Sequence, residues 1–502
     1  MQLRIGRSGG PVIGRSEEHN PKRHRSSNHR GLWRRSPGGV FLLLCALSIA
    51  ASTRPHYGST ARVLLQAKIS TLDPLAESEY PDERDKLSKF IFETLTEIDA
   101  QGHLQPRLAS SWRSDSGDRV WQFQLRPANF QDGTAVTAAA VVTSLKSVSP
   151  DWKTGATNRQ AFTIETPVPS PHLPELLALE KFGIVKRLPD NTLVGSGAYK
   201  LTQWQAGEHA LFTANDDYWE GRPYPDAIDV EMGASLRDHL LERSLGRDHA
   251  AQLGIDQARA LEQTSQNLVL SRPAELVVMV FAESEHGGPG NRRKPVDPHI
   301  RAAISYAVDR TAISNLLLQR KAAPATALLP QWLTGYEFML ADKGDAEQER
   351  KAAASASPVA LAYDFADPVS KLVAERIAVD AHEAGIVVQP YADTHIKTRA
   401  ARKGSNADAI LLRLPLPALA PAPALAGFAD ALDLSPETLS GILSAGRPDD
   451  LFTAERKILE DHRIIPVVHL SQILWLNSTV HNWQQLPDGE WNLEQMWVEG
   501  GR

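Results

Sequence analysis

The stretch VALAYDFADPVSKLVAERIAVDAHEAGIVVQP, residues 359–390, decides the fold class. Its short apolar ends indicate two strands, and the amphipathic segment between them indicates a helix. Asp367 and Pro368 fit the N-cap and the first residue of that helix, and Gly385 fits its C-cap. Strands joined by a helical crossover pair in parallel. The stretch therefore predicts an α/β fold.

The segments on either side of this unit also carry strand and helix patterns. Residues 120–125, VWQFQL, alternate with a period of two, and residues 276–281, LVVMVF, are typical of a strand buried on both faces. Residues 198–215 predict a hairpin. Further predictions are a strand at 62–69, helices at 86–95, 137–145 (N-cap Thr137) and 297–320 (N-cap Asp297), an irregular Pro/Ala-rich segment at 414–426, and two strands within 464–476.

Length and composition indicate an ordinary globular chain. It has 502 residues, 42% hydrophobic and 23% charged, which leaves room for about three domains. A single Cys excludes a disulfide scaffold and a Cys-rich metal site. The net charge of −6 includes nine Lys or Arg against two Glu in residues 1–50, so the remainder is strongly acidic. An acidic body repels phosphate backbones, which argues against nucleic acid as a partner.

The N-terminus predicts export. A basic segment precedes the apolar run VFLLLCALSIAA at 40–51, which is too short to span a membrane but fits a secretory signal with cleavage near Ala50 or Ala51. Residues 1–51 are therefore interpreted as a basic n-region and signal peptide, and the location as periplasmic or extracytoplasmic. Lipoprotein anchoring through Cys45 stays open but is not favoured, because Leu44 stands where a small residue is needed.

A series of short motifs supplies a more specific interpretation. Together they resemble the family 5 bacterial extracellular solute-binding proteins, which are the receptors of oligopeptide, dipeptide and nickel ABC importers. The resemblance covers residues 60–340 and, more weakly, 358–390 and 455–480. The motifs, in chain order, are Phe92–Leu95, Pro106–Trp112, Val120–Arg126, Asn129–Leu145, Val194–Tyr199, Trp204–Glu208, Asn215–Pro223, Ile300–Arg310 and Leu328–Pro330.

The resemblance implies a periplasmic-binding-protein-like fold of type II, cluster C. Such a fold has two lobes joined by two chain crossings, closes on its ligand by hinge motion, and here carries a small inserted third domain. The ligand cleft lies between domains I and III. Mapped onto this sequence, domain I is residues 60–76, 190–275 and 470–502, domain II is 77–189, and domain III is 276–469.

The implied function is that of the extracytoplasmic solute-binding component of an ABC importer. It would bind a peptide or peptide-like small solute without chemistry, cofactor or metal, act as a monomer, and deliver the solute to permease subunits in the membrane. In peptide receptors of this kind the ligand lies extended and pairs with protein backbone as an added strand. An aspartate after a strand that corresponds to Ala407–Leu412 holds its ammonium group.

That aspartate is missing from this sequence. The strand continues as RLPLPALAPAPALAGF, and no carboxylate follows until Asp430, while Asp408 matches an acidic residue before the strand. A buried ammonium without a partner would cost several kcal/mol. A receptor without this anchor should reject free N-termini or use another acid.

Five residues are candidate ligand contacts. Glu77 and Glu79 follow Leu72-Asp73-Pro74, near which the family places cleft contacts; both also fit solvated loop charges. Arg413 is the charge nearest the missing anchor and could bind a ligand carboxylate in a bidentate manner, or face solvent. His469 and Trp475 follow a proline at a position where the family often places aromatic cleft residues.

Other function classes stay open with less support. A secreted hydrolase would need a motif such as HExxH or GxSxG; His382-Glu383 lacks the second histidine, and Gly195-Ser196-Gly197 is one residue short. A cytoplasmic regulator would need a DNA-binding module, and residues 1–40 show no helix-turn-helix pattern. The more serious alternative is a degenerate receptor fold that acts as an interaction or sensory module, because a Pro/Ala-rich segment replaces the expected pocket segment.

Overall fold

The structure is a computed structural model that describes residues 55–262, 267–283, 294–341, 344–353, 357–396, 402, 405–493 and 495–499. The predicted signal peptide and Cys45 lie outside these residues. Within them, every helix is too short or too polar to cross a lipid bilayer.

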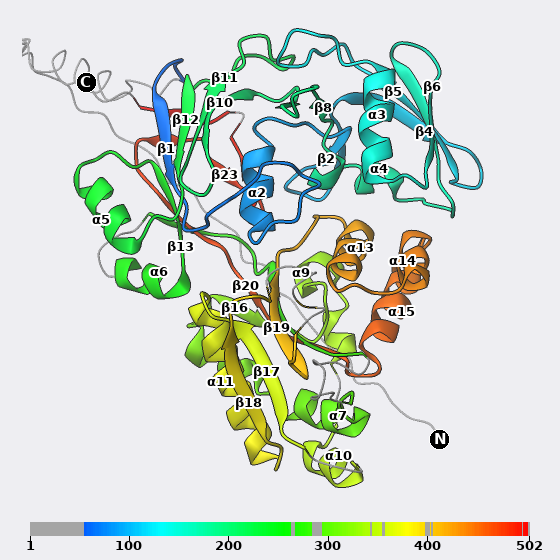
Figure 1. The fold of residues 1–502 in the computed structure, drawn as a ribbon, viewed down its shortest axis with the longest axis vertical. Helices are drawn as coiled ribbons and strands as arrows, with labels where there is room; N and C mark the ends of the chain where they lie inside the picture. The colour runs from blue at the N-terminus through cyan, green and yellow to red at the C-terminus, as the bar shows by residue number, and fades with distance from the viewer. Residues whose placement is uncertain are drawn as a thin grey trace, which may run out of the picture. The chain divides into compact units, whose positions relative to one another are not determined.

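The first large sheet has seven strands in the order β10-β11-β12-β1-β13-β21-β14 (Figure 1). Its hairpin β10–β11 is antiparallel, as residues 198–215 predicted. The strand predicted at 62–69 is the shorter β1, which pairs in parallel with β12 and β13. The bounds are β10 Tyr199–Gln205, β11 His209–Ala214, β12 Ala227–Glu231, β1 Thr60–Leu64, β13 Ala250–Leu253, β21 Ile473–Leu476 and β14 Leu268–Leu270.

The second large sheet has six strands in the order β16-β20-β15-β19-β17-β18. The predicted strand–helix–strand unit is confirmed, because β17 and β18 are parallel and are joined by helix α11. Asp367 caps α11 by accepting a hydrogen bond from Val369 N. The bounds are β16 Ala322–Pro324, β20 Ile464–Leu470, β15 Glu275–Phe281, β19 Ala409–Leu414, β17 Val359–Asp364, β18 Val388–Asp393 and α11 Pro368–Glu383.

A third, antiparallel sheet has the order β4-β5-β7-β6 and packs against helix α3 (Ala138–Val148). Thr137 caps α3 by accepting a hydrogen bond from Ala140 N, as predicted. The apolar residues of this sheet join one core with helices α13, α14 and α15. The bounds are β4 Ala109–Ser114, β5 Val120–Leu125, β7 Ala161–Glu165, β6 Lys153–Ala156, α13 Pro421–Ala431, α14 Pro436–Leu443 and α15 Pro448–Leu459.

The chain passes between the two large sheets at two places. One passage lies between β14 and β15, and the other lies between β20 and β21. The two passages run side by side, since Ser271 N donates to Gln472 O at 3.0 Å and Gln472 N donates to Ser271 Oγ at 2.9 Å. Paired chain crossings of this kind act as hinges, because their few backbone residues take up the φ and ψ changes when one lobe rotates against the other. The domain boundaries given above stay a prediction, although each large sheet draws its strands from one predicted domain.

Three local predictions differ from the structure. The helix predicted at 86–95 is α2, Pro81–Ser88, and the chain leaves helical geometry because the carbonyls of Phe90 and Ile91 accept hydrogen bonds from Tyr199 N and Gly197 N. The helix predicted at 297–320 is interrupted: α7 ends at Ala307, where Asp309 N donates instead to Asp380, and helical structure resumes as α8 (Arg310–Ala312) and a π-helical turn at Ile313–Leu317.

The third difference is a helix within the Pro/Ala-rich segment. Residues 421–431 form α13 although the segment contains several prolines. Pro421 and Pro423 occupy the first turn, where backbone N–H groups have no partner inside the helix, so proline is tolerated there.

Candidate functional site

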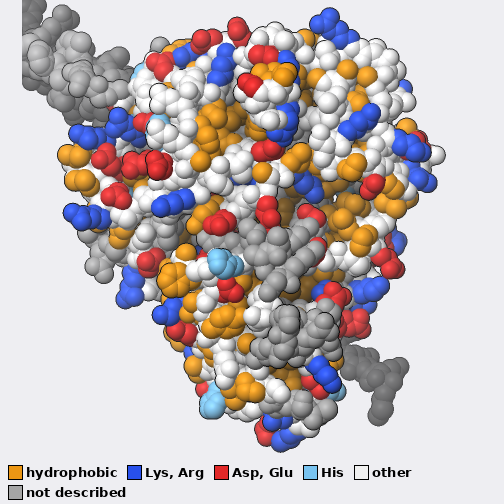
Figure 2. All heavy atoms as spheres, in the orientation of Figure 1, with side chains coloured by type: hydrophobic (Ala, Val, Ile, Leu, Met, Phe, Trp, Pro, Cys, Tyr) orange, Lys and Arg blue, Asp and Glu red, His pale blue; other side chains and the backbone are white. Residues whose placement is uncertain are grey.

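A cavity of about 1360 Å³ lies where the two large sheets and α2 meet. Its lining includes the ends of β13 and β19, the chain passage between β20 and β21, α2, the loop after β19 and parts of the C-terminal segment 486–493. Fifteen lining residues are Asp or Glu and six are Lys or Arg, so the cavity is strongly acidic. On the outer face shown in Figure 2, by contrast, acidic and basic side chains are interspersed.

Three of the five predicted contacts line this cavity. Glu77 and Glu79 lie on the exposed loop that leads into α2, and Arg413 lies near the end of β19. The structure therefore brings the two glutamates of this loop and the arginine of β19 to one cavity. Their contact with a ligand stays a prediction.

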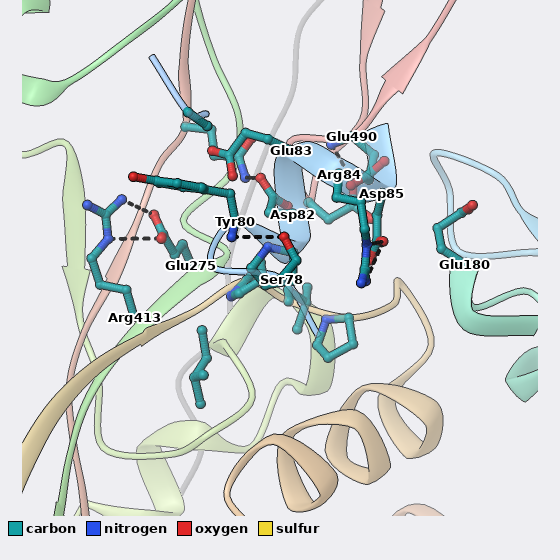
Figure 3. Close-up of a pocket in the computed structure, with 18 of the residues that line it drawn as sticks. Ser78, Tyr80, Asp82, Glu83, Arg84, Asp85, Glu180, Glu275, Arg413 and Glu490 are labelled. Atoms are coloured by element: carbon teal, nitrogen blue, oxygen red, sulfur yellow. Dashed lines mark hydrogen bonds and ion pairs between the residues drawn. The ribbon is translucent and has the colours of Figure 1, made fainter. Parts of the chain in front are cut away.

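The guanidinium of Arg413 is engaged by two carboxylates of the protein itself. Its Nε and one terminal nitrogen lie 2.9 and 2.6 Å from the two oxygens of Glu275 (Figure 3). Its other terminal nitrogen lies 3.0 Å from Asp367 Oδ1. Burial alone would lower the pKa of Arg413, but Glu275 and Asp367 raise it above its usual value. Glu275 thus occupies the bidentate position, so a ligand carboxylate would have to displace it.

His469 and Trp475 lie outside the lining of the cavity. His469 is fully buried in β20, where its Nε2 is 3.0 Å from Leu328 O and burial lowers its pKa to about 4. Trp475 is buried in β21, with its ring edge-on to His239. Both side chains fill cores of the sheets, and their proposed ligand role stays untested.

The loop after β19 occupies the place where the resemblance puts the ammonium anchor. Residues 415–419 line the cavity and include Pro415 and Pro417, which have no N–H to offer to a paired ligand backbone. Asp430 also lines the cavity. Asp408 is buried, and its side chain accepts a hydrogen bond from Ala360 N at 2.8 Å within the second sheet.

Sequence reasoning missed a group of carboxylates at one end of the cavity. We call it the acidic end, and Figure 3 shows most of it around α2. The run PDERDK at 81–86 and the turn at 488–490 each resemble ordinary solvated charges. The density of charge in the run is the one sequence signal that could have indicated a site. The acidic end consists of Asp82, Glu83, Asp85, Glu180, Asp488 and Glu490.

Burial makes several of these carboxylates weak acids. Burial raises the pKa of Asp85 to about 7 and that of Glu180 to about 8, against the opposing effects of Arg84 and Lys89 respectively. Burial and then repulsion from Glu490 raise the pKa of Asp488 to about 7. The acidic end therefore gathers carboxyl groups in a poorly solvated place where their negative charge is costly.

These pKa values predict that stability decreases at alkaline pH. A carboxyl whose pKa is raised on folding contributes stability that is lost as pH rises through the folded pKa, here up to about 8. The lowered pKa of His469 reduces stability only below about pH 6.5, so it does not affect this comparison. We expect a lower melting temperature at about pH 8.5 than at about pH 6.5, measured by calorimetry. Glu180→Gln should reduce this difference, and Glu165→Gln on the exposed surface should not.

A second buried carboxylate joins three of the motifs found in the sequence. Glu93 lies at the cavity wall and accepts hydrogen bonds from Ser196 Oγ at 2.8 Å, Trp219 Nε1 at 2.8 Å and Tyr218 Oη at 3.0 Å. Burial raises its pKa, while Arg107 and these donors lower it. The motifs at 92–95, 194–199 and 215–223 therefore converge on one structural centre beside the cavity.

The fold and cavity define a two-lobed ligand-binding protein, and comparison with known proteins identifies its family. Residues 103–429 match the model of the bacterial extracellular solute-binding proteins, family 5. The chain belongs to this family, as its motifs indicated.

The curated relatives are distant. The probable D,D-dipeptide-binding periplasmic protein DdpA of Escherichia coli K12 is 26% identical over 318 residues, 56% of this chain and 60% of that protein. The periplasmic oligopeptide-binding protein OppA of Salmonella typhimurium is 24% identical over 316 residues, 54% of this chain and 57% of that protein. The matched regions thus span less than two thirds of these relatives.

Solved structures confirm the predicted fold class over most of the chain. AgaA of A. tumefaciens R10, solved with agropinic acid, superposes with a TM-score of 0.73 at 19% identity, covering 88% of this chain and 99% of that one. AppA of Bacillus subtilis, solved with a nonapeptide, superposes with a TM-score of 0.71 at 16% identity, covering 89% of this chain and 100% of that one. At such identities the likeness establishes the fold alone.

Proposed function

We propose that this chain is the extracytoplasmic solute-binding component of an ABC importer and binds a peptide or peptide-like solute. The observation that carries the proposal is the cavity of about 1360 Å³ at the junction of two sheets that are joined by two adjacent passages. A cavity of this volume exceeds that of ordinary small-molecule pockets, so it has room for a short peptide.

Binding proceeds by hinge closure, without chemical change in the solute. Rotation about the passages at 271–274 and 471–472 brings the wall formed by β19 toward α2. No group of three or more His, Cys, Asp or Glu side chains with metal-binding geometry occurs among the described residues. The chain acts as an exported monomer, and permease subunits in the membrane receive the solute.

Solute binding is tested with the purified chain lacking residues 1–51. We expect at least one member of a panel of tri- to pentapeptides to bind with a Kd near micromolar in titration calorimetry, which corresponds to a binding free energy of about −8 kcal/mol. The same peptide should reduce the radius of gyration in X-ray scattering. Acetylated versions of the peptides show whether a free N-terminus is needed, and Glu77→Ala and Glu79→Ala show whether either glutamate holds it.

The alternative is a receptor fold that has lost its solute and acts as an interaction or sensory module. Pro415 and Pro417, together with the engagement of Arg413 by Glu275, favour it, since they remove usual ways of holding a peptide. Unchanged scattering and unchanged melting across the whole panel would contradict the transport proposal and support this alternative.

A further inference from the structure

The acidic end of the cavity holds more carboxylates than nearby cations. Its six carboxylates face three cationic side chains, those of Arg84, Lys86 and Lys89. Arg84 pairs with Asp85 at 2.7 Å, and Lys86 pairs with Asp82. Lys89 lies 2.9 Å from Glu490 and 3.4 Å from Glu180. The three cations thus leave Glu83 and Asp488 without an ion pair at this end.

Asp488 is the carboxylate with the least compensation. It is only 8% exposed and lines the cavity. Its Oδ1 accepts a hydrogen bond from Glu490 N at 3.1 Å, inside its own turn. Among the described residues, no side chain forms a hydrogen bond or ion pair with it. Lys89 acts on Asp488 electrostatically, but its ammonium is already paired with Glu490 and Glu180. A nine-tenths buried carboxylate without an ion pair of its own is costly to keep charged, so a cationic group on a ligand would compensate it.

The rest of the lining indicates the remainder of the ligand. The wall that follows β19 is apolar and includes Leu414, Leu416, Leu419 and Phe428. Its prolines cannot donate to a ligand backbone, and Arg413 is neutralised by Glu275 and Asp367. This wall therefore offers an apolar surface and no available anion-binding group of its own.

We propose that the cavity takes a solute that carries an ammonium or guanidinium group beside an apolar body, and that Asp488 anchors its cation. The inference rests on the proposed function and names its substrate class. A charge-assisted hydrogen bond to Asp488 compensates the buried carboxylate, and the apolar body lies against the wall after β19. Solutes with an additional anionic group are excluded by the charge of the cavity.

The test uses three tripeptides, each acetylated at the N-terminus and amidated at the C-terminus so that only the middle side chain can carry a charge: Leu-Lys-Leu, Leu-Met-Leu and Leu-Glu-Leu. In titration calorimetry we expect Leu-Lys-Leu to bind at least about tenfold more tightly than Leu-Met-Leu, and Leu-Glu-Leu to bind most weakly. Asp488→Asn keeps the turn, since the amide oxygen still accepts from Glu490 N. It should reduce the advantage of the lysine peptide to about threefold or less and leave Leu-Met-Leu within about twofold.

Glu347→Gln on the exposed helix α10 (Ala346–Ala352) is the matched control, because it removes one carboxylate outside the cavity. It should change none of the three affinities. Equal binding of the three peptides would overturn the charge selectivity and leave the solute-binding function in place. A lysine preference that persists in Asp488→Asn would overturn Asp488 as the anchor. Binding of no peptide at all would contradict both this inference and the proposed function.

Discussion

Gly195→Ala lowers the free energy of unfolding by about 3 kcal/mol, because the new methyl group would collide with backbone. A Cβ built on Gly195 lies 1.9 Å from Ile91 O and 2.6 Å from Ile91 C. No rotamer change relieves this contact. The same carbonyl accepts a hydrogen bond from Gly197 N at 2.8 Å, so moving the segment 195–197 away breaks that bond as well. Urea unfolding followed by tryptophan fluorescence measures the loss.

Gly441→Ala provides the matched control for this substitution. Gly441 lies in α14, and a Cβ built there has no atom within 4 Å. Alanine is favoured over glycine inside a helix by about 1 kcal/mol, so this variant should be as stable as the parent or more stable. If Gly195→Ala unfolded at the same urea concentration as Gly441→Ala, the close approach of residues 195 and 91 would be refuted.

The same close approach shows why only part of the fold could be predicted from the sequence. The predicted strand–helix–strand unit at 359–390 depends on local signals, such as periodicity, an Asp-Pro start and a Gly end, and the structure confirms it. The helix predicted at 86–95 was wrong because its apolar spacing is fulfilled by a turn. The carbonyls at positions 90 and 91 bond to a segment more than 100 residues away, and no local pattern reports such a partner.

The candidate site was predictable only in outline. The motifs identified the family, and the missing aspartate drew attention to the segment after β19, which lines the cavity. Asp82 and Asp488 are some 400 positions apart, and their meeting depends on how the C-terminal segment returns to α2. Arg413 lines this cavity, and its role as a ligand contact stays a prediction; its partners Glu275 and Asp367 stand at the start of β15 and at the N-cap of α11, far away in the sequence. Charge balance in a cavity is a tertiary property.

Glu93→Ala lowers the free energy of unfolding by about 4 kcal/mol, the largest loss that we expect from a single side chain. The carboxylate is 4% exposed and accepts hydrogen bonds from Ser196, Tyr218 and Trp219. Its removal leaves these donors without an acceptor and takes a carboxylate away from the Arg107 guanidinium, which lies 3.5 Å from it. The melting temperature and urea midpoint should both fall.

Glu93→Gln separates the hydrogen bonds from the charge. The amide oxygen can still accept from Tyr218 and Trp219, so this variant should lose about half as much stability as the alanine variant. Glu97→Ala, at a partly exposed carboxylate that also lies near Arg107, is the control and should cost under about 1 kcal/mol. Because Glu93, Phe92 and Tyr199 all line the cavity, Glu93→Ala should also weaken solute binding. A stable Glu93→Ala variant with unchanged binding would show that the three motifs converge on this carboxylate without depending on it.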